Sequence, residues 1–89
     1  MRRIDNPFLN ILPSLDLHGE TALTSTILVK EFINDNIMLK NKEIVIIHGK
    51  GFGILKRAVH NYLKTDKRVV EYKIDNFNDG VTRVILGGF

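Results

Sequence analysis

The sequence predicts a single α/β domain, an α+β sandwich in which two helices pack on a four-stranded mixed sheet. Three observations lead to this prediction. Short runs rich in β-branched residues alternate with segments whose apolar residues recur at helical spacing, in the order β-α-β-α-β-β. The chain has 89 residues, which suits one domain, and 44% of them are hydrophobic, as in globular proteins. No repeat of solenoid period interrupts this order.

The first half of the chain predicts an arm, a strand and a helix. Residues 1–13 carry two prolines and no clear periodicity, so we expect an arm lying on a domain formed by residues 14–89. The apolar anchors of this arm would be Phe8, Leu9, Ile11 and Leu12. Residues 14–17 alternate as a short strand does, and residues 20–38 lack Gly and Pro, as expected for a helix. The buried face of that helix would comprise Leu23, Ile27, Val29, Phe32, Ile33 and Ile37.

The second half predicts three strands and one more helix. Residues 44–47 are all β-branched, which is typical of a central strand that is buried on both faces. Residues 54–64 have apolar positions at helical spacing. These positions are Ile54, Leu55, Ala58, Val59, Tyr62 and Leu63. Two further strands, 69–74 and 81–86, flank a turn at residues 76–80 that is rich in Asn, Asp and Gly.

The composition excludes several classes of protein. There is no cysteine, so neither disulfides nor thiolate metal ligands are available. The apolar runs are far too short to span a bilayer. Arg2 and Arg3 are not followed by a long apolar core, which argues against a secretory signal. We therefore expect a soluble, cytoplasmic protein without membrane contact, and we favour a monomer.

Positive charge is concentrated in the middle of the chain. The net charge is only +3, but residues 44–70 contain one acid, Asp66, and six basic residues. The basic residues are Lys50, Lys56, Arg57, Lys64, Lys67 and Arg68. A local basic field of this kind favours a polyanion such as nucleic acid, although a solvated helix face gives the same pattern.

Two His-Gly pairs are predicted to meet at one edge of the sheet. Asp16 and His18 lie on the same face of the first strand because side chains alternate, and His48 ends the second strand. A β-α-β connection makes these two strands parallel, so both end at the same edge, where open α/β sheets bind ligands. Two histidines and a carboxylate would therefore converge there, whereas a lone histidine is more often structural.

The segment His48-Gly49-Lys50-Gly51-Phe52-Gly53 leads directly into the second predicted helix. The first amides of that helix would face any anion above the loop, and glycine allows close approach of the backbone. Neither nucleotide-binding signature fits. No GxxxxGK followed by Ser or Thr occurs, and Ile54 replaces the third glycine of GxGxxG. A tight strand-to-helix turn explains one glycine, but not three with a lysine between them.

At these residues the sequence resembles the Smr (small MutS-related) domain. That family is marked by Leu-Asp-Leu-His-Gly, here residues 15–19, by His-Gly-x-Gly-x-Gly-x-Leu, here 48–55, and by Gly-x-Thr, here 80–82. Order and spacing agree from Ser14 to Leu86, but the turn at residues 76–79 is usually richer in glycine. The resemblance implies a nucleic-acid-binding fold like the C-terminal domain of translation initiation factor three. It also implies endonuclease activity on DNA or RNA, with links to ribosomes or to recombination and repair.

Phosphodiester cleavage suggests a role for each candidate residue. His18 and His48 would form the proton-transfer pair, and Asp16 would orient His18 or hold a divalent cation such as Mg²⁺ or Mn²⁺. The residues expected to bind phosphate or the rest of the strand are Gly49, Lys50, Gly51, Phe52, Gly53, Lys56, Arg57, Lys64 and Thr82.

Structural alternatives accompany these assignments. Asp16 is equally suited to capping the first helix or accepting a hydrogen bond from the glycine loop. For His48 the alternative is a hydrogen bond to the backbone that sets the turn. Phe52 would either stack on a base or act as a packing anchor. His60 shares the basic side of the second helix, where we expect a surface residue. The rival to a nuclease is a module that binds nucleic acid or ribosomes without catalysis.

Overall fold

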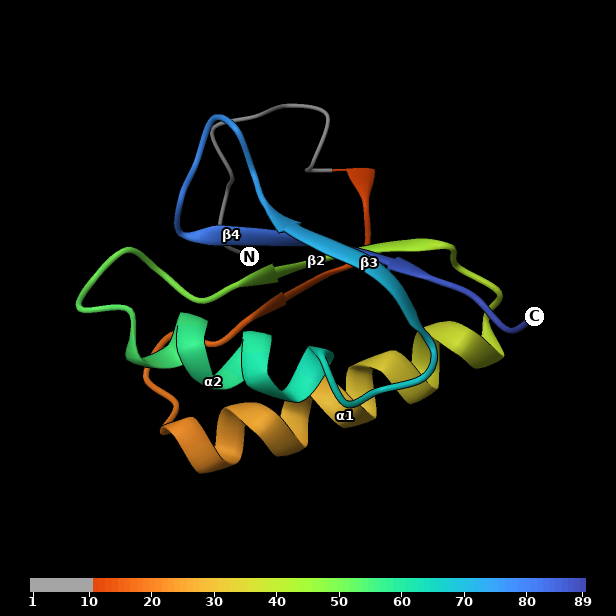
Figure 1. Ribbon diagram of the computed structural model, residues 1–89, viewed down its shortest axis with the longest axis horizontal. Helices are drawn as coiled ribbons and strands as arrows, with labels where there is room; N and C mark the ends of the chain where they lie inside the picture. The colour runs from red at the N-terminus through yellow and green to blue at the C-terminus, as the bar shows by residue number, and fades with distance from the viewer. Residues whose placement is uncertain (1–10) are drawn as a thin grey trace.

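The computed structural model describes residues 11–89 (Figure 1). Its elements follow the predicted order: β1 (Ser14–Asp16), α1 (Ala22–Met38), β2 (Glu43–Ile47), α2 (Ile54–Leu63), β3 (Val69–Ile74) and β4 (Val81–Leu86). The bounds of β3 and β4 match the prediction, and the others differ by one or two residues. The helix predicted from residue 20 begins two residues later, because Thr21 is its N-cap. Thr21 and Thr24 form a capping box.

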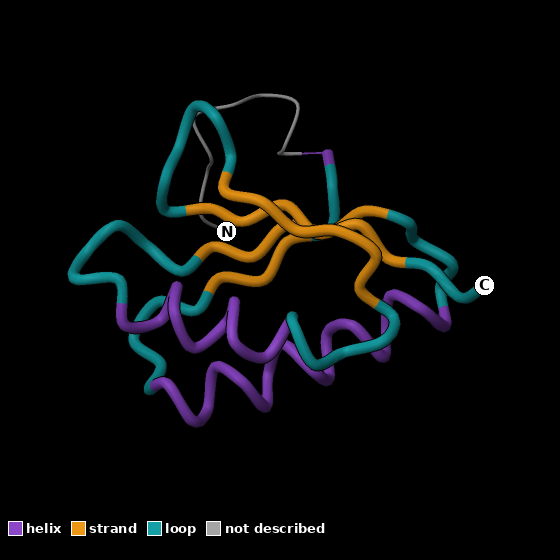
Figure 2. Tube along the Cα trace, in the orientation of Figure 1, coloured by secondary structure: helices purple, strands orange, loops and turns teal. Residues whose placement is uncertain are grey.

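The four strands form one mixed sheet in the order β1-β2-β4-β3. β1 and β2 are parallel, whereas β4 is antiparallel to both β2 and β3. Both helices lie on the same side of the sheet, as Figures 1 and 2 show. The fold class predicted from the sequence is therefore confirmed. No helix in the described part of the chain is long and apolar enough to cross a bilayer.

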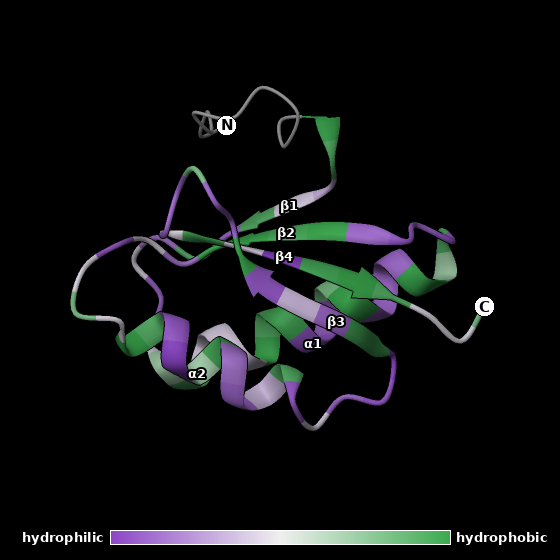
Figure 3. Cartoon of the chain, turned by 45° about the horizontal axis from the view of Figure 1, so that its top comes forward, coloured by the Kyte–Doolittle hydropathy of each residue, from purple (hydrophilic) through white to green (hydrophobic). Residues whose placement is uncertain are grey.

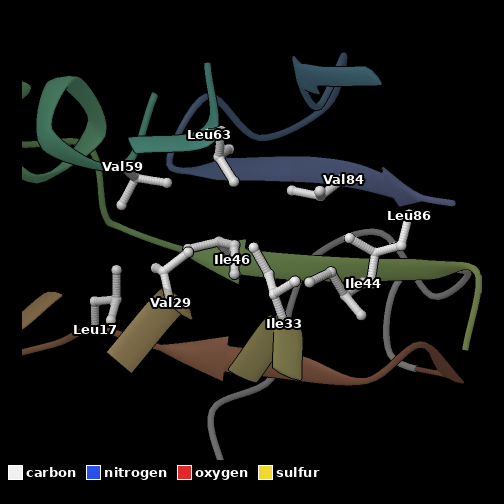
Figure 4. Close-up of a cluster of buried hydrophobic side chains, with 9 residues drawn as sticks. All are labelled: Leu17, Val29, Ile33, Ile44, Ile46, Val59, Leu63, Val84 and Leu86. Carbon is white, nitrogen blue, oxygen red and sulfur yellow. The ribbon is translucent and has the colours of Figure 1, made fainter. Parts of the chain in front are cut away.

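The main hydrophobic core fills the space between the helices and the sheet. Its buried side chains, drawn in Figure 4, are Leu17, Val29, Ile33, Ile44, Ile46, Val59, Leu63, Val84 and Leu86. A smaller cluster of Val45, Ile47 and Val81 lies on the opposite face of the sheet. β2 contributes to both clusters, so the prediction that it is buried on both faces is confirmed. Figure 3 shows hydrophobic segments on both the strands and the helices.

The predicted apolar face of α1 was too broad. Leu23 is 72% exposed and Ile27 is 49% exposed. The buried line runs through positions 25, 29, 33 and 36, which recur every three or four residues. Leu23 and Ile27 are each two residues away from this line, which places them on roughly the opposite side of the helix. Ile54 of α2 is likewise 62% exposed, although it was predicted to be buried.

The predicted arm lies only partly within the described residues. Phe8 and Leu9 are outside them, so their role as anchors stays a prediction. Leu12 packs against the smaller cluster, and the carbonyl of Pro13 accepts a hydrogen bond of 2.9 Å from the Val45 amide. Ile11 is 77% exposed. The end of the arm therefore joins the domain through Leu12 and Pro13.

Candidate functional site

The loops that follow β1 and β2, and the hairpin that joins β3 to β4, lie at the same edge of the sheet. β1 and β2 end there because they are parallel, with Asp16 paired to Ile47. β3 also ends there, and β4 begins there, because β4 runs antiparallel to both of its neighbours. The predicted meeting of the two His-Gly pairs at one edge is therefore confirmed. The β3–β4 hairpin is the third component of this edge.

The glycine loop is tied to the hairpin through Gly80. The Gly80 carbonyl accepts hydrogen bonds from the amides of His48 (2.9 Å) and Gly49 (3.0 Å). A Cβ atom at position 80 would lie 3.0 Å from the carbonyl carbon of Gly49, so only glycine fits without a shift. The predicted role of Gly49 in binding phosphate cannot use its own amide, because that amide is already bonded. Lys50 and Asp79 form an exposed ion pair at 3.9 Å across the same two loops.

The glycine loop leads into α2 without supplying a side chain that caps the helix. Gly49 and Gly53 adopt left-handed backbone conformations, with φ of 81° and 79°. Gly53 is the N-cap of α2 and offers no side-chain hydrogen bond, so the first amides of the helix lack a side-chain cap. Phe52 is 97% exposed at the tip of the loop. A hollow of about 170 Å³ is lined by His48, Gly49, Gly51, Phe52, Gly53, Ile54 and Leu55.

Thr82 joins two histidines beneath the loop. Its hydroxyl oxygen lies 2.7 Å from Nε2 of His48 and 2.7 Å from Nε2 of His60, and the residue is fully buried. The ring of His60 also packs edge-on against Tyr72, with centroids 4.9 Å apart. The predicted phosphate contact of Thr82 is therefore wrong, because this residue is not at the surface. His60 is half-buried, and its ring bonds inward to Thr82 where a surface side chain was expected.

The direction of these hydrogen bonds follows from their partners. Nδ1 of His48 lies 3.1 Å from the Gly49 carbonyl, which only accepts, so this nitrogen carries a proton. In the neutral ring, Nε2 of His48 then accepts from the Thr82 hydroxyl. That hydroxyl oxygen accepts in turn from Nε2–H of His60. Protonation of both rings would leave the Thr82 proton without either imidazole as an acceptor.

Burial and charge both disfavour protonation of this pair. Burial lowers the pKa of His48, the hydrogen bond to Gly49 raises it, and the nearby Lys56 lowers it, with Asp79 opposing. Burial also lowers the pKa of His60, helped by His48, Lys56 and Lys64. The pair therefore favours the neutral form, in which the chain of hydrogen bonds is complete.

We expect acid to destabilise the domain through these two histidines. The unfolded chain takes up their protons near the ordinary pKa of about 6.5, whereas the folded protein takes them up only at lower pH. The contribution of these two histidines to the free energy of unfolding should therefore be fully present above about pH 7 and be lost as the pH drops below about 6.5. Urea denaturation between about pH 5 and 8 measures this fall. His60→Gln keeps an N–H donor but cannot titrate, so the fall should be smaller; an unchanged profile would contradict the assignment.

Asp16 and His18 form the exposed part of the edge. Oδ1 of Asp16 accepts a 2.9 Å hydrogen bond from the backbone amide of His18. This bond closes a tight turn after β1. The alternative in which Asp16 caps the first helix is wrong, because Thr21 does so. Both Asp16 and His18 are exposed, whereas His48 is 7% exposed and both of its ring nitrogens are hydrogen-bonded. A ligand at this edge therefore reaches His18 more easily than His48.

The basic residues differ in exposure and in whether a carboxylate already pairs with them. Arg57 and Lys64 are exposed on α2, Lys50 is exposed in the loop, and Lys56 is half-buried beside Gly53. Arg68 instead binds Asp66, with Nη2 and Oδ2 2.8 Å apart. This ion pair holds the pKa of the Asp66 carboxyl well below its usual range. The positive charge near the edge therefore comes from the loop and α2.

Comparison with known proteins places the chain in a family. The Smr domain family matches residues 15–87. The chain belongs to the Smr domain family. It is 32% identical to Endonuclease MutS2 of Clostridium kluyveri over 77 residues, and 34% identical to that of Ligilactobacillus salivarius over 71 residues. These matches cover 86% and 80% of this chain, but only 10% and 9% of the two MutS2 proteins.

Two solved structures share the fold of this Smr domain. The Smr domain of Thermus thermophilus MutS2 superposes with a TM-score of 0.83 at 29% identity, covering 86% of this chain and all of that one. YdaL, a stand-alone small MutS-related protein from Escherichia coli, gives a TM-score of 0.80 at 22% identity. That match covers 99% of this chain and 82% of YdaL. The family resemblance inferred from the motifs is confirmed.

Proposed function

We propose that this Smr domain binds nucleic acid at the edge formed by β1, β2 and the β3–β4 hairpin, and cleaves phosphodiester bonds there. One observation supports the proposal above all: the exposed Asp16 and His18 share this edge with the glycine loop and the uncapped start of α2. The similar MutS2 proteins are named endonucleases, which supports the same chemistry.

Each group would have a distinct task in cleavage. His18 would transfer a proton to or from the reacting oxygen, because its imidazole is exposed at this edge and histidine is the most common general acid or base in enzymes. Lys50, Lys56 and the first amides of α2 would stabilise charge on the phosphate. Arg57 and Lys64 would follow the strand through its backbone charge. On RNA the 2′-hydroxyl is available as the nucleophile, whereas DNA requires an activated water.

Asp16 is the residue we assign to a divalent cation, Mg²⁺ or Mn²⁺. Within residues 11–89, no group of three or more His, Cys, Asp or Glu side chains is placed to hold a metal. A single carboxylate suits Mg²⁺, which usually takes its remaining ligands from water and substrate phosphate. A bound cation would stabilise negative charge on the phosphate. Asp16 would also continue to fix the turn that presents His18.

A binding module without catalysis is the second candidate. It is favoured by the state of His48, whose two ring nitrogens are both bonded within the protein. Only His18 then remains at the edge as an accessible imidazole within the described residues, although cleavage ordinarily needs both an acid and a base. The catalytic role of His48, contact with ribosomes, a monomeric state and a cytoplasmic location stay predictions.

Reversal of charge on α2 tests the binding face. Lys56→Glu combined with Arg57→Glu should weaken binding to any sequence by a similar factor and flatten its salt dependence, because phosphate contacts carry no base information. Fluorescence anisotropy with labelled oligonucleotides over a range of salt concentrations measures both effects. Lys30→Glu with Lys42→Glu changes the net charge equally and serves as the control. Equal losses in the two double variants would show that only net charge matters.

A further inference from the structure

Two phenylalanines are exposed at the proposed binding edge. Phe52 in the glycine loop is 97% exposed, and Phe77 in the β3–β4 hairpin is 78% exposed. Neither belongs to the hydrophobic clusters of the described residues. Single exposed apolar residues are common, but these two extend from loops of one edge that are bonded to each other through Gly80, with Lys50 and Asp79 paired across them.

The hairpin holds the backbone of Phe77 in a fixed position. The buried carboxylate of Asp75 accepts hydrogen bonds from the amides of Phe77 (3.0 Å) and Asn78 (3.1 Å) through the same oxygen, Oδ2. The Asn78 side chain accepts a 2.9 Å bond from the Gly80 amide. Gly80 is in turn bonded to the glycine loop. The backbone of Phe77 is thus fixed relative to that loop, which lowers the conformational entropy lost when Phe77 binds a ligand.

We propose that Phe77 and Phe52 stack on unpaired bases, so that the substrate is single-stranded nucleic acid or an unpaired segment of a larger one. An aromatic ring stacks on a base only when the face of that base is free, and in a duplex both faces are covered by neighbouring bases. Lys50, Lys56 and Arg57 would bind the phosphates between the stacked bases. Such contacts discriminate little between sequences, because every base has a π-face.

This inference rests on the proposed function, since it names the substrate class of the same site. The carboxylate of Asp79 stands on the same hairpin and would repel a phosphate. Its ion pair with Lys50 is long, at 3.9 Å, and exposed, so it is weak and leaves Lys50 able to bind a phosphate. A strand would therefore contact the hairpin through the ring of Phe77 rather than through phosphate.

The first experiment compares three labelled ligands of equal length by anisotropy: oligo(dT), an abasic strand and a blunt duplex. The parent should prefer oligo(dT) to the abasic strand, and Phe77→Ala should bind oligo(dT) about tenfold more weakly with little change for the abasic strand. Phe89→Ala is the matched control. Phe89 is 53% exposed and follows β4, whose end lies at the opposite edge of the sheet. This variant should bind like the parent.

The second experiment places a reporter at the hairpin. The chain contains no tryptophan, so Phe77→Trp gives a single indole signal. Oligo(dT) should quench this fluorescence by stacking, whereas the abasic strand should not.

The possible failures are distinguishable. Equal binding of oligo(dT) and the abasic strand by the parent, or tighter binding of the duplex, would overturn this inference and leave the proposed binding intact. Full retention of oligo(dT) affinity by Phe77→Ala, with no quenching of Phe77→Trp, would overturn the role of Phe77. Failure of all three ligands to bind at low salt would overturn the proposed function itself, and this inference with it.

Discussion

His18→Ala should slow cleavage of nucleic acid by about 10²–10⁴-fold, the usual contribution of general acid–base catalysis, while leaving most of the binding intact. His18 is exposed, and its backbone amide, which alanine retains, donates the hydrogen bond to Asp16. The loop, the lysines and the helix amides would still hold the strand. Single-turnover cleavage and anisotropy on the same preparation measure the two quantities.

His48→Ala provides the comparison for this result. His48 is buried and bonded to Thr82 and Gly49, so its removal should loosen the glycine loop and reduce both binding and stability. A loss of cleavage alone in His48→Ala, with normal cleavage by His18→Ala, would reverse our assignment of the proton-transfer group. It would restore the role first predicted for His48 from the sequence.

Thr82→Val should lower the free energy of unfolding by about 1–3 kcal/mol, the cost of leaving buried polar groups without partners. Valine has nearly the same shape, but it removes the hydroxyl that lies between His48 and His60. Urea denaturation at pH 7.5 measures the loss. Because a domain of this kind has only about 5–15 kcal/mol of total stability, the change is easily detected.

Thr82→Ser is the control for this prediction. Serine keeps the hydroxyl and loses a buried methyl group, which costs roughly 1 kcal/mol of transfer free energy. If Thr82→Val were as stable as the parent and Thr82→Ser less stable, packing of the methyl group would explain the position. The hydrogen-bond chain would then contribute nothing measurable to stability.

Much of the fold could be predicted because local patterns and tertiary packing agree. The β-branched run of β2 required no knowledge of distant residues. The edge shared by His18 and His48 followed from the parallel direction of two strands joined by a β-α-β connection. The buried line of α1 could not be found this way, since it includes the polar residues Ser25 and Asn36. Asn36 is accommodated because its amide donates to the Phe32 carbonyl.

The candidate site was predicted less completely than the fold. His60 was expected at the surface because lysines and arginine surround it in sequence, but its ring faces β4. The sequence did indicate that Thr82 is buried. Thr82 alternates with Val84 and Leu86 on the same side of β4, and that side faces the helices. A buried hydroxyl needs partners, and histidines from other elements supply them only in the folded chain.

Cleavage by the purified domain tests the central proposal most directly. End-labelled DNA and RNA, single-stranded and duplex, would be incubated with the parent and with Asp16→Asn purified in the same way, each with Mg²⁺, Mn²⁺ or EDTA. Asp16→Asn keeps the shape of the side chain but removes its charge. We predict that the parent yields cleaved product from at least one unpaired substrate and that Asp16→Asn yields much less. Equal cleavage by both preparations, or stable binding by the parent with no product under any condition, would contradict a nuclease site at this edge.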